Sequence, residues 1–165
     1  MPTMTILSLI LVVLFAGATI WRTKELPESV SAMVYTLPTG GWQWLWTIWL
    51  VLVDIFTFAP AVEILDADGL GWLAFLPMAM IGFVAVWPLF DKEHRVWHYV
   101  LSILAGFISQ VDVWQISPWC LLLWLLFVGW AWLCKRRGRA SEFATYAVLA
   151  AEAVSYLAII ASEVV

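Results

Sequence analysis

Six apolar stretches, each separated from the next by a short polar or charged segment, constrain the fold of this chain more than any other feature. Each is about as long as an α-helix must be to cross the hydrocarbon core of a bilayer. The stretches cover residues 4–21, 42–59, 70–90, 96–111, 118–134 and 143–161. The sequence therefore predicts an all-α integral membrane protein, a single domain with six transmembrane helices.

The overall composition supports this prediction. Hydrophobic residues make up 64% of the 165 residues and charged residues 12%, whereas a soluble domain is about 45–50% apolar and about 25% charged. The 13 tryptophans fit the same reading, because indole rings favour the bilayer interface. Basic residues are too few and too dispersed for nucleic-acid binding. The lipid bilayer is the predicted partner, and no nucleic acid is expected.

A short amphipathic helix is predicted after the first span, over about residues 27–37. Its apolar residues Val30, Met33, Val34 and Leu37 follow the i, i+3, i+4, i+7 spacing of one helix face. Such a helix lies in the plane of the membrane interface. A re-entrant segment that lines a cavity is the alternative.

The distribution of charge predicts the orientation of the spans. All eight basic residues lie in the first, third and fifth connecting segments: Arg22, Lys24, Lys92, Arg95, Lys135, Arg136, Arg137 and Arg139. The second and fourth segments are expected as loops over residues 60–69 and 112–117. All of their charged residues are acidic: Glu63, Asp66, Asp68 and Asp112. Because basic loops stay in the cytoplasm, both termini are predicted outside. The expected location is a plasma membrane, such as a bacterial inner membrane.

Acidic residues within the spans are the first candidates for function. Glu152 lies near the middle of the last span, where a charged side chain costs roughly 2.5–3.5 kcal/mol on insertion scales. We expect it to face the bundle interior, neutral or paired with a donor such as Tyr156. Asp54 lies inside the second span. These three residues form the predicted ligand or ion path, although a protonated Glu152 that only joins helices remains an alternative.

A charged turn holds both histidines of the chain. His94 and His98 are four residues apart and share one face of a helix, and Asp91 lies three residues before His94. Two imidazoles and a carboxylate can hold a divalent metal at a catalytic site. The alternative is a solvated His94 with His98 at the level of the headgroups. No other cofactor is predicted.

Two families resemble parts of this pattern. In length and tryptophan content the chain resembles the translocator-protein (tryptophan-rich sensory protein) family, which has five helices and binds porphyrins and sterols. The histidine pair, with Ser29 or Ser31 upstream, resembles the alkaline ceramidase and progestin-receptor group of membrane hydrolases, which places His-x-x-x-His in the last of seven helices. Here the pair opens the fourth span. The motifs of neither family match residue by residue, so no site residue is transferred from them.

Three functions remain compatible with the sequence. The first is transport or binding of a small molecule, ion or proton through a polar path in the helix bundle. The second is a non-catalytic membrane subunit or assembly factor that binds another membrane protein or a second copy of itself. The third is an intramembrane metal-dependent hydrolase that uses His94, His98 and Asp91. We favour the first function and place the enzyme last.

Overall fold

The computed structural model describes residues 2–24, 42–90, 95–136 and 143–164. Every regular element in these ranges is helical: α1 (Pro2–Thr23), α3 (Trp42–Asp66), α4 (Gly71–Phe90), α5 (Arg95–Ile116), the 3-10 helix η1 (Pro118–Leu122), α6 (Leu123–Arg136) and α7 (Phe143–Val164). The all-α prediction is confirmed for this part of the chain. The interfacial helix predicted over residues 27–37 lies outside it.

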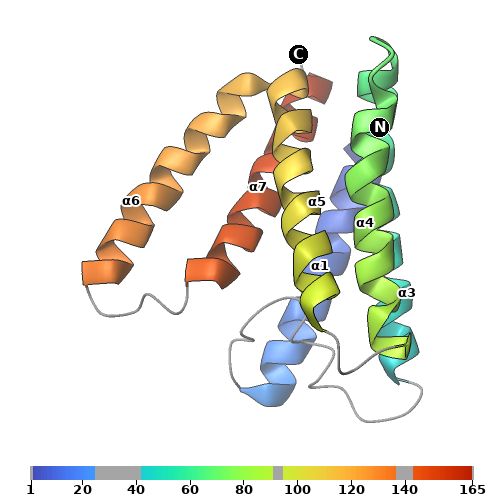
Figure 1. Ribbon diagram of the computed structural model, residues 1–165, viewed down its shortest axis with the longest axis vertical. Helices are drawn as coiled ribbons and strands as arrows, with labels where there is room; N and C mark the ends of the chain where they lie inside the picture. The colour runs from blue at the N-terminus through green and yellow to red at the C-terminus, as the bar shows by residue number, and fades with distance from the viewer. Residues whose placement is uncertain (1, 25–41, 91–94, 137–142, 165) are drawn as a thin grey trace.

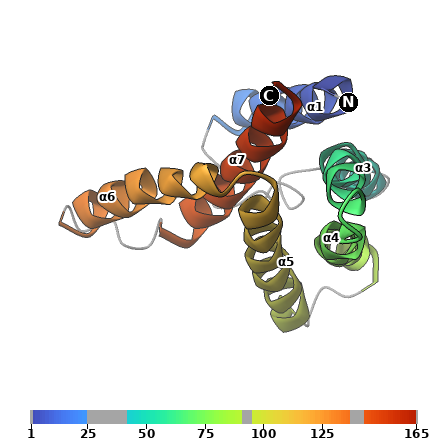
Figure 2. The same cartoon turned by 90° about the horizontal axis from the view of Figure 1, so that it is seen from above.

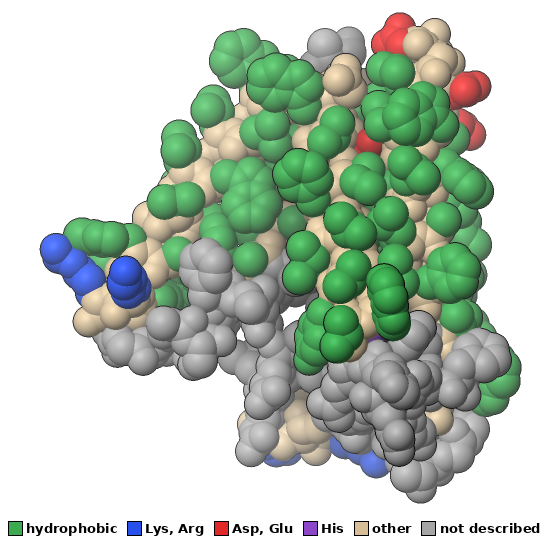
Figure 3. Space-filling view, viewed as in Figure 1, with side chains coloured by type: hydrophobic (Ala, Val, Ile, Leu, Met, Phe, Trp, Pro, Cys, Tyr) green, Lys and Arg blue, Asp and Glu red, His purple; other side chains and the backbone are tan. Residues whose placement is uncertain are grey.

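Successive long helices run in alternating directions (Figure 1). The end of α1, the start of α3, the end of α4, the start of α5, the end of α6 and the start of α7 therefore lie at the same end of the molecule. Arg22, Lys135 and Arg136 lie at this end. Glu63 and Asp66, in the last turn of α3, lie at the opposite end. The basic and acidic helix ends of the described chain are thus separated, as Figure 3 also shows.

Four helices of the described chain are long and apolar enough to cross a membrane. They cover Thr3–Thr23, Gln43–Asp66, Val96–Ile116 and Pro118–Arg136, and shorter apolar helices cover Gly71–Val86 and Ala150–Ser162. Large apolar side chains point outward on these helices (Figure 3). Examples are Val13, Phe107 and Leu126, with exposed fractions of 62%, 70% and 72%. An outer surface of this kind suits an apolar solvent better than water.

The loop predicted over residues 60–69 is wrong for residues 60–66, because α3 continues through Pro60 to Asp66. Proline removes one backbone hydrogen bond of a helix. Packing supports the turns that follow: Ala61 and Leu65 are buried against Ala74 of α4 and Ile159 of α7. The turn into α4 comes only after Asp66 and uses Gly69 at a positive φ of 71°, a conformation that glycine adopts at little cost.

The loop predicted over residues 112–117 is wrong for residues 112–116, for the same physical reason. The helix α5 runs to Ile116 and includes Asp112. Val113 is buried with Val154 and Ala158 of α7, and Ile116 packs against this cluster. Apolar burial thus extends the helix over a residue that the sequence placed in an exposed acidic loop.

The helices pack around α3, which contacts α1, α4, α5 and α7. Near its start, Trp46 and Trp49 pack against Phe15 of α1, with ring centroids 5.9 and 4.2 Å away. The Thr47 hydroxyl donates a hydrogen bond of 2.9 Å to the Ala85 carbonyl of α4. The helix α6 instead extends away from the other helices (Figure 2) and packs against α7 and η1.

Candidate functional site

Three hydroxyl groups from three helices meet inside the bundle. The Ser8 Oγ of α1 lies 2.7 Å from the Thr57 Oγ1 of α3 and 2.6 Å from the Tyr156 hydroxyl of α7. The Thr57 Oγ1 and the Tyr156 hydroxyl are 3.0 Å apart. All three residues are buried. Each pair is within hydrogen-bonding distance, so the three residues form a closed ring that we call the hydroxyl cluster.

Asp54 lies one turn before Thr57 on α3 and is 4% exposed. Its Oδ1 atom is buried and has no hydrogen-bond partner among the described residues. Its Oδ2 atom points to α4, where a Cβ added to Gly82 would lie 3.9 Å from it. The glycine therefore leaves room beside this carboxyl group. A buried carboxyl oxygen without a partner is energetically costly, so Asp54 needs an explanation other than helix packing.

Glu152 lies one turn before Tyr156 on α7 and is partly buried. Tyr156 in turn lies 3.0 Å from the Thr57 Oγ1, one turn after Asp54 on α3. The structure thus brings the three predicted path residues, Glu152, Asp54 and Tyr156, to one region of the bundle. Whether they carry a ligand or an ion stays a prediction.

Gln110 of α5 connects the hydroxyl cluster region to α6. Its side-chain amide nitrogen donates to the Ala151 carbonyl and to the Ser155 Oγ of α7, at 3.3 and 3.4 Å. Its amide oxygen accepts a hydrogen bond of 2.8 Å from the Trp124 indole nitrogen of α6. One side chain therefore joins three helices.

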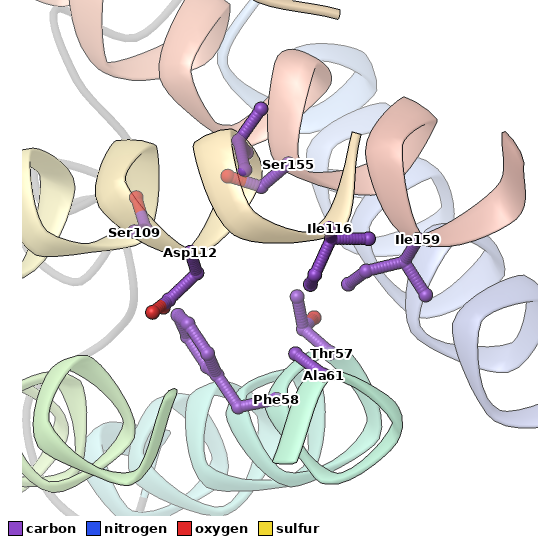
Figure 4. A pocket seen from close by; sticks show the side chains of 9 residues that line it. Thr57, Phe58, Ala61, Ser109, Asp112, Ile116, Ser155 and Ile159 are labelled. Atoms are coloured by element: carbon purple, nitrogen blue, oxygen red, sulfur yellow. The ribbon is translucent and has the colours of Figure 1, made fainter. Parts of the chain in front are cut away.

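Asp112 of α5 lies beside a small cavity between α3, α5 and α7, which Thr57 of α3 also lines (Figure 4). Its side chain extends from α5 toward α3 and is 3% exposed. Both of its carboxyl oxygens are buried without a hydrogen-bond partner among the described residues. Thr57, Ser109 and Ser155 also line the cavity. The cavity therefore shares Thr57 with the hydroxyl cluster.

The predicted metal site is represented by only one of its three residues. His98 is partly buried on α5, and its ring stands edge-on to Tyr99 with centroids 5.8 Å apart. Asp91 and His94 lie outside the described residues. In the described part of the chain, no group of three histidine, cysteine or acidic side chains is placed to hold a metal ion. The metal hypothesis stays a prediction.

The sequence prediction missed Ser8, Thr57, Gln110 and Asp112. The first two are single hydroxyl residues inside apolar helices. A hydroxyl there can donate its hydrogen bond to the backbone of its own helix, so its burial costs little energy and the sequence does not mark it. The spacing of Asp54 and Thr57, one turn apart on α3, carried a usable signal of a shared polar face. Asp112 was placed in a loop, so its burial was not considered.

Comparisons with protein-family models, with curated proteins and with solved structures find no match to this chain.

Chemically, the arrangement combines groups that bind and release protons with groups that pass them on. A hydroxyl both donates and accepts hydrogen bonds, and a carboxyl group can be neutral or ionised. The hydroxyl cluster joins α1, α3 and α7, with Asp54 and Glu152 one turn away along α3 and α7.

Proposed function

We propose that this chain is an integral membrane protein that conducts protons through the hydroxyl cluster and its neighbouring carboxyl groups. The observation that carries the proposal is the closed ring of Ser8, Thr57 and Tyr156, whose contacts measure 2.6–3.0 Å. Asp54 and Glu152 are the groups that load and unload the ring. The proposal rests on the membrane character of the helices.

The size of the cavity beside the hydroxyl cluster favours a proton over an organic molecule. The cavity between α3, α5 and α7 has a volume of about 10 Å³, whereas small-molecule sites enclose about 300–1,000 Å³. A proton needs no cavity, because it moves along hydrogen bonds between hydroxyl groups and water. Ionisable residues inside membrane helices commonly mark such routes.

The membrane topology belongs to the same proposal. All six α-helices, including α4 and α7, cross the bilayer, because they alternate in direction and place their own ends at two opposite ends of the molecule (Figure 1). The end with Arg22, Lys135 and Arg136 faces the cytoplasm, following the tendency of basic residues to stay inside. Both termini then face outside.

Proton flux into liposomes tests this function. The purified protein is reconstituted with a pH-sensitive dye inside the vesicles, and a potassium diffusion potential drives proton entry. We expect the wild-type protein to acidify the interior severalfold faster than protein-free vesicles do. Asp54→Asn and Tyr156→Phe should each reduce the rate to that of protein-free vesicles.

Glu63→Gln is the matched control, because Glu63 is an exposed acid at the end of α3. This variant should keep the wild-type rate. A wild-type rate equal to that of protein-free vesicles would exclude proton conduction. An Asp54→Asn rate equal to the wild-type rate would exclude the route through Asp54.

A second candidate function is that of a membrane subunit that binds another membrane protein. The position of α6, which extends away from the other helices (Figure 2), favours it. Leu125, Leu126 and Val128 of α6 have exposed fractions of 68%, 72% and 60%. Sedimentation in a mild detergent tests this role, with a partner or a second copy expected in the complex. A monomer with α6 bound only to detergent would contradict it.

A further inference from the structure

Exposed tryptophan side chains of the described residues gather at the two ends of the molecule. Seven of them have exposed fractions between 52% and 78%, and each lies within about one turn of an end of its helix. We call those at the end with Arg22, Lys135 and Arg136 the basic-end belt and those at the opposite end the acidic-end belt. The basic-end belt consists of Trp21, Trp44, Trp97 and Trp132, and the acidic-end belt of Trp72, Trp114 and Trp119.

The surface between the two belts is apolar. On α5, Ile103 and Phe107 are 68% and 70% exposed between Trp97 and Trp114. Asp112, the one acid between these two tryptophans, is only 3% exposed. Indole rings favour the level of the lipid headgroups. An apolar band bounded by tryptophan at both ends is therefore the surface that lipid chains cover.

The two belts are close together along α5. Trp114 follows Trp97 by 17 residues, which is about 26 Å at a rise of about 1.5 Å per residue. Both Cα–Cβ bonds tilt toward the start of the helix, so the two rings are displaced in the same direction and their separation stays near this value. Trp132 follows Trp119 by 13 residues through η1 and α6, which is about 20 Å with the steeper rise of the 3-10 turn.

Two other helices give limits that agree with this spacing. On α3, the exposed Glu63 follows Trp44 by 19 residues, so the apolar face between them is at most about 28 Å long. The apolar part of α4, Gly71–Val86, is one of the shorter apolar helices of 10–17 residues and extends about 24 Å. An average hydrocarbon core is about 30 Å thick, and interfacial rings lie outside it. A tilted helix spans less than its own length, so no tilt removes this difference.

We propose that the apolar band between the belts fits a bilayer whose hydrocarbon core is no thicker than about 26 Å, so that the protein binds phospholipids with short acyl chains in preference to longer ones. In a thicker bilayer, one belt is drawn into the hydrocarbon or the surrounding lipid is compressed, and each ångström of mismatch costs free energy. Short chains remove this cost. The inference rests on the membrane topology proposed above but not on proton conduction.

Tryptophan fluorescence measures this preference, because bromine atoms on the chains of a contacting lipid quench it. The purified protein is reconstituted in mixtures of a brominated 18-carbon phosphatidylcholine with an unbrominated one whose monounsaturated chains have 14, 18 or 22 carbons. A lipid that binds more tightly displaces the brominated lipid and restores more fluorescence. We expect the 14-carbon lipid to bind severalfold more tightly than the 18-carbon lipid, and the 22-carbon lipid to bind most weakly. Equal binding of all three, or tightest binding of a longer lipid, would overturn the proposal.

Quenching in the pure brominated lipid separates this inference from the topology on which it rests. Strong quenching together with tightest binding of the 18-carbon lipid would contradict only the thin bilayer. Absence of quenching would contradict the membrane topology, and the inference with it.

A double variant tests the role of the belts. Trp97→Leu with Trp114→Leu removes both belt residues of α5, so the preference for the 14-carbon over the 18-carbon lipid should fall. Phe107→Leu is the matched control, because it replaces an exposed aromatic side chain of the same helix between the belts, and it should keep the wild-type preference. A full preference in the double variant would show that the belts do not set the thickness and would overturn the proposal.

Discussion

Tyr156 shows how a single buried hydroxyl can join three helices. Its oxygen lies 2.6 Å from the Ser8 Oγ and 3.0 Å from the Thr57 Oγ1. Without it, Ser8 and Thr57 still bond to each other and to the Val53 carbonyl. The stability that depends on Tyr156 is therefore the hydrogen bonding of one hydroxyl, and it can be measured separately from the proposed proton conduction.

Tyr156→Phe should lower the free energy of unfolding in detergent by about 1 kcal/mol, the net value of a buried hydrogen bond. Tyr99→Phe is the matched control, because the Tyr99 side chain is 56% exposed on α5 and its hydroxyl is expected to contribute little. A loss no larger than that of the control would contradict the hydroxyl cluster as described.

Asp54→Asn separates a functional carboxyl group from a structural one. The buried Oδ1 atom has no hydrogen-bond partner to lose, and the neutral amide removes the cost of burying a charge. We expect the unfolding temperature to stay the same or to rise, while proton flux is lost. A clear drop in the unfolding temperature would instead assign Asp54 a role in joining helices.

At the scale of the residue, the sequence identified the carboxyl groups but not their surroundings. Asp54 and Glu152 stand out because a charge in an apolar helix is costly wherever it points. Ser8 and Thr57 gave no such signal, since each can satisfy its hydroxyl on the helix backbone. Their partners are set by how α1, α3 and α7 pack, which no local pattern encodes.

At the scale of the helix, tertiary packing overrides local signals at two ends. Pro60 and Asp112 are residue types that favour the end of a helix, yet α3 and α5 continue past them. In both cases the next turn carries apolar residues that are buried against α7: Ala61 and Leu65 after Pro60, and Val113 after Asp112. Apolar periodicity beyond Pro60 and Asp112 was the signal that could have corrected these predictions.

Substitution of Gln110 tests whether its hydrogen bonds hold α6 to the other helices. Gln110→Leu leaves the Trp124 indole nitrogen without its acceptor and removes the bonds to Ala151 and Ser155. We expect a loss of about 1–3 kcal/mol in unfolding free energy and faster amide hydrogen exchange in α6. The control Gln115→Leu, at an exposed position of the same helix, should change stability by less than about 0.5 kcal/mol. Equal effects of the two variants would show that Gln110 does not hold α6.

The close contact of α3 and α4 predicts that a larger side chain between these helices destabilises the protein. Ala85 is fully buried, and its carbonyl accepts the hydrogen bond from Thr47. Ala85→Leu forces a larger side chain into this contact and should lower the unfolding free energy by about 1–3 kcal/mol. Ala153→Leu is the control, because Ala153 is exposed on α7. An Ala85→Leu protein as stable as this control would show that the two helices are not in close contact.

At the scale of the whole molecule, the alternating direction of the helices explains why the basic and the acidic helix ends lie at opposite ends. The sequence predicted the grouping of basic and acidic segments from their order alone, and the described helices place Lys135 and Arg136 at the end opposite Glu63 and Asp66. The tilt of α6 away from the bundle was not predictable, because it depends on contacts between distant helices.

The account as a whole depends on helices that cross a membrane with the basic end in the cytoplasm. Cysteine labelling of intact cells tests this most directly, with Cys120 and Cys134 first replaced by serine. A membrane-impermeant maleimide should label Asp68→Cys in intact cells. It should label Lys135→Cys only after the membrane is permeabilised. Labelling of both positions in intact cells, or of neither before permeabilisation, would contradict the account.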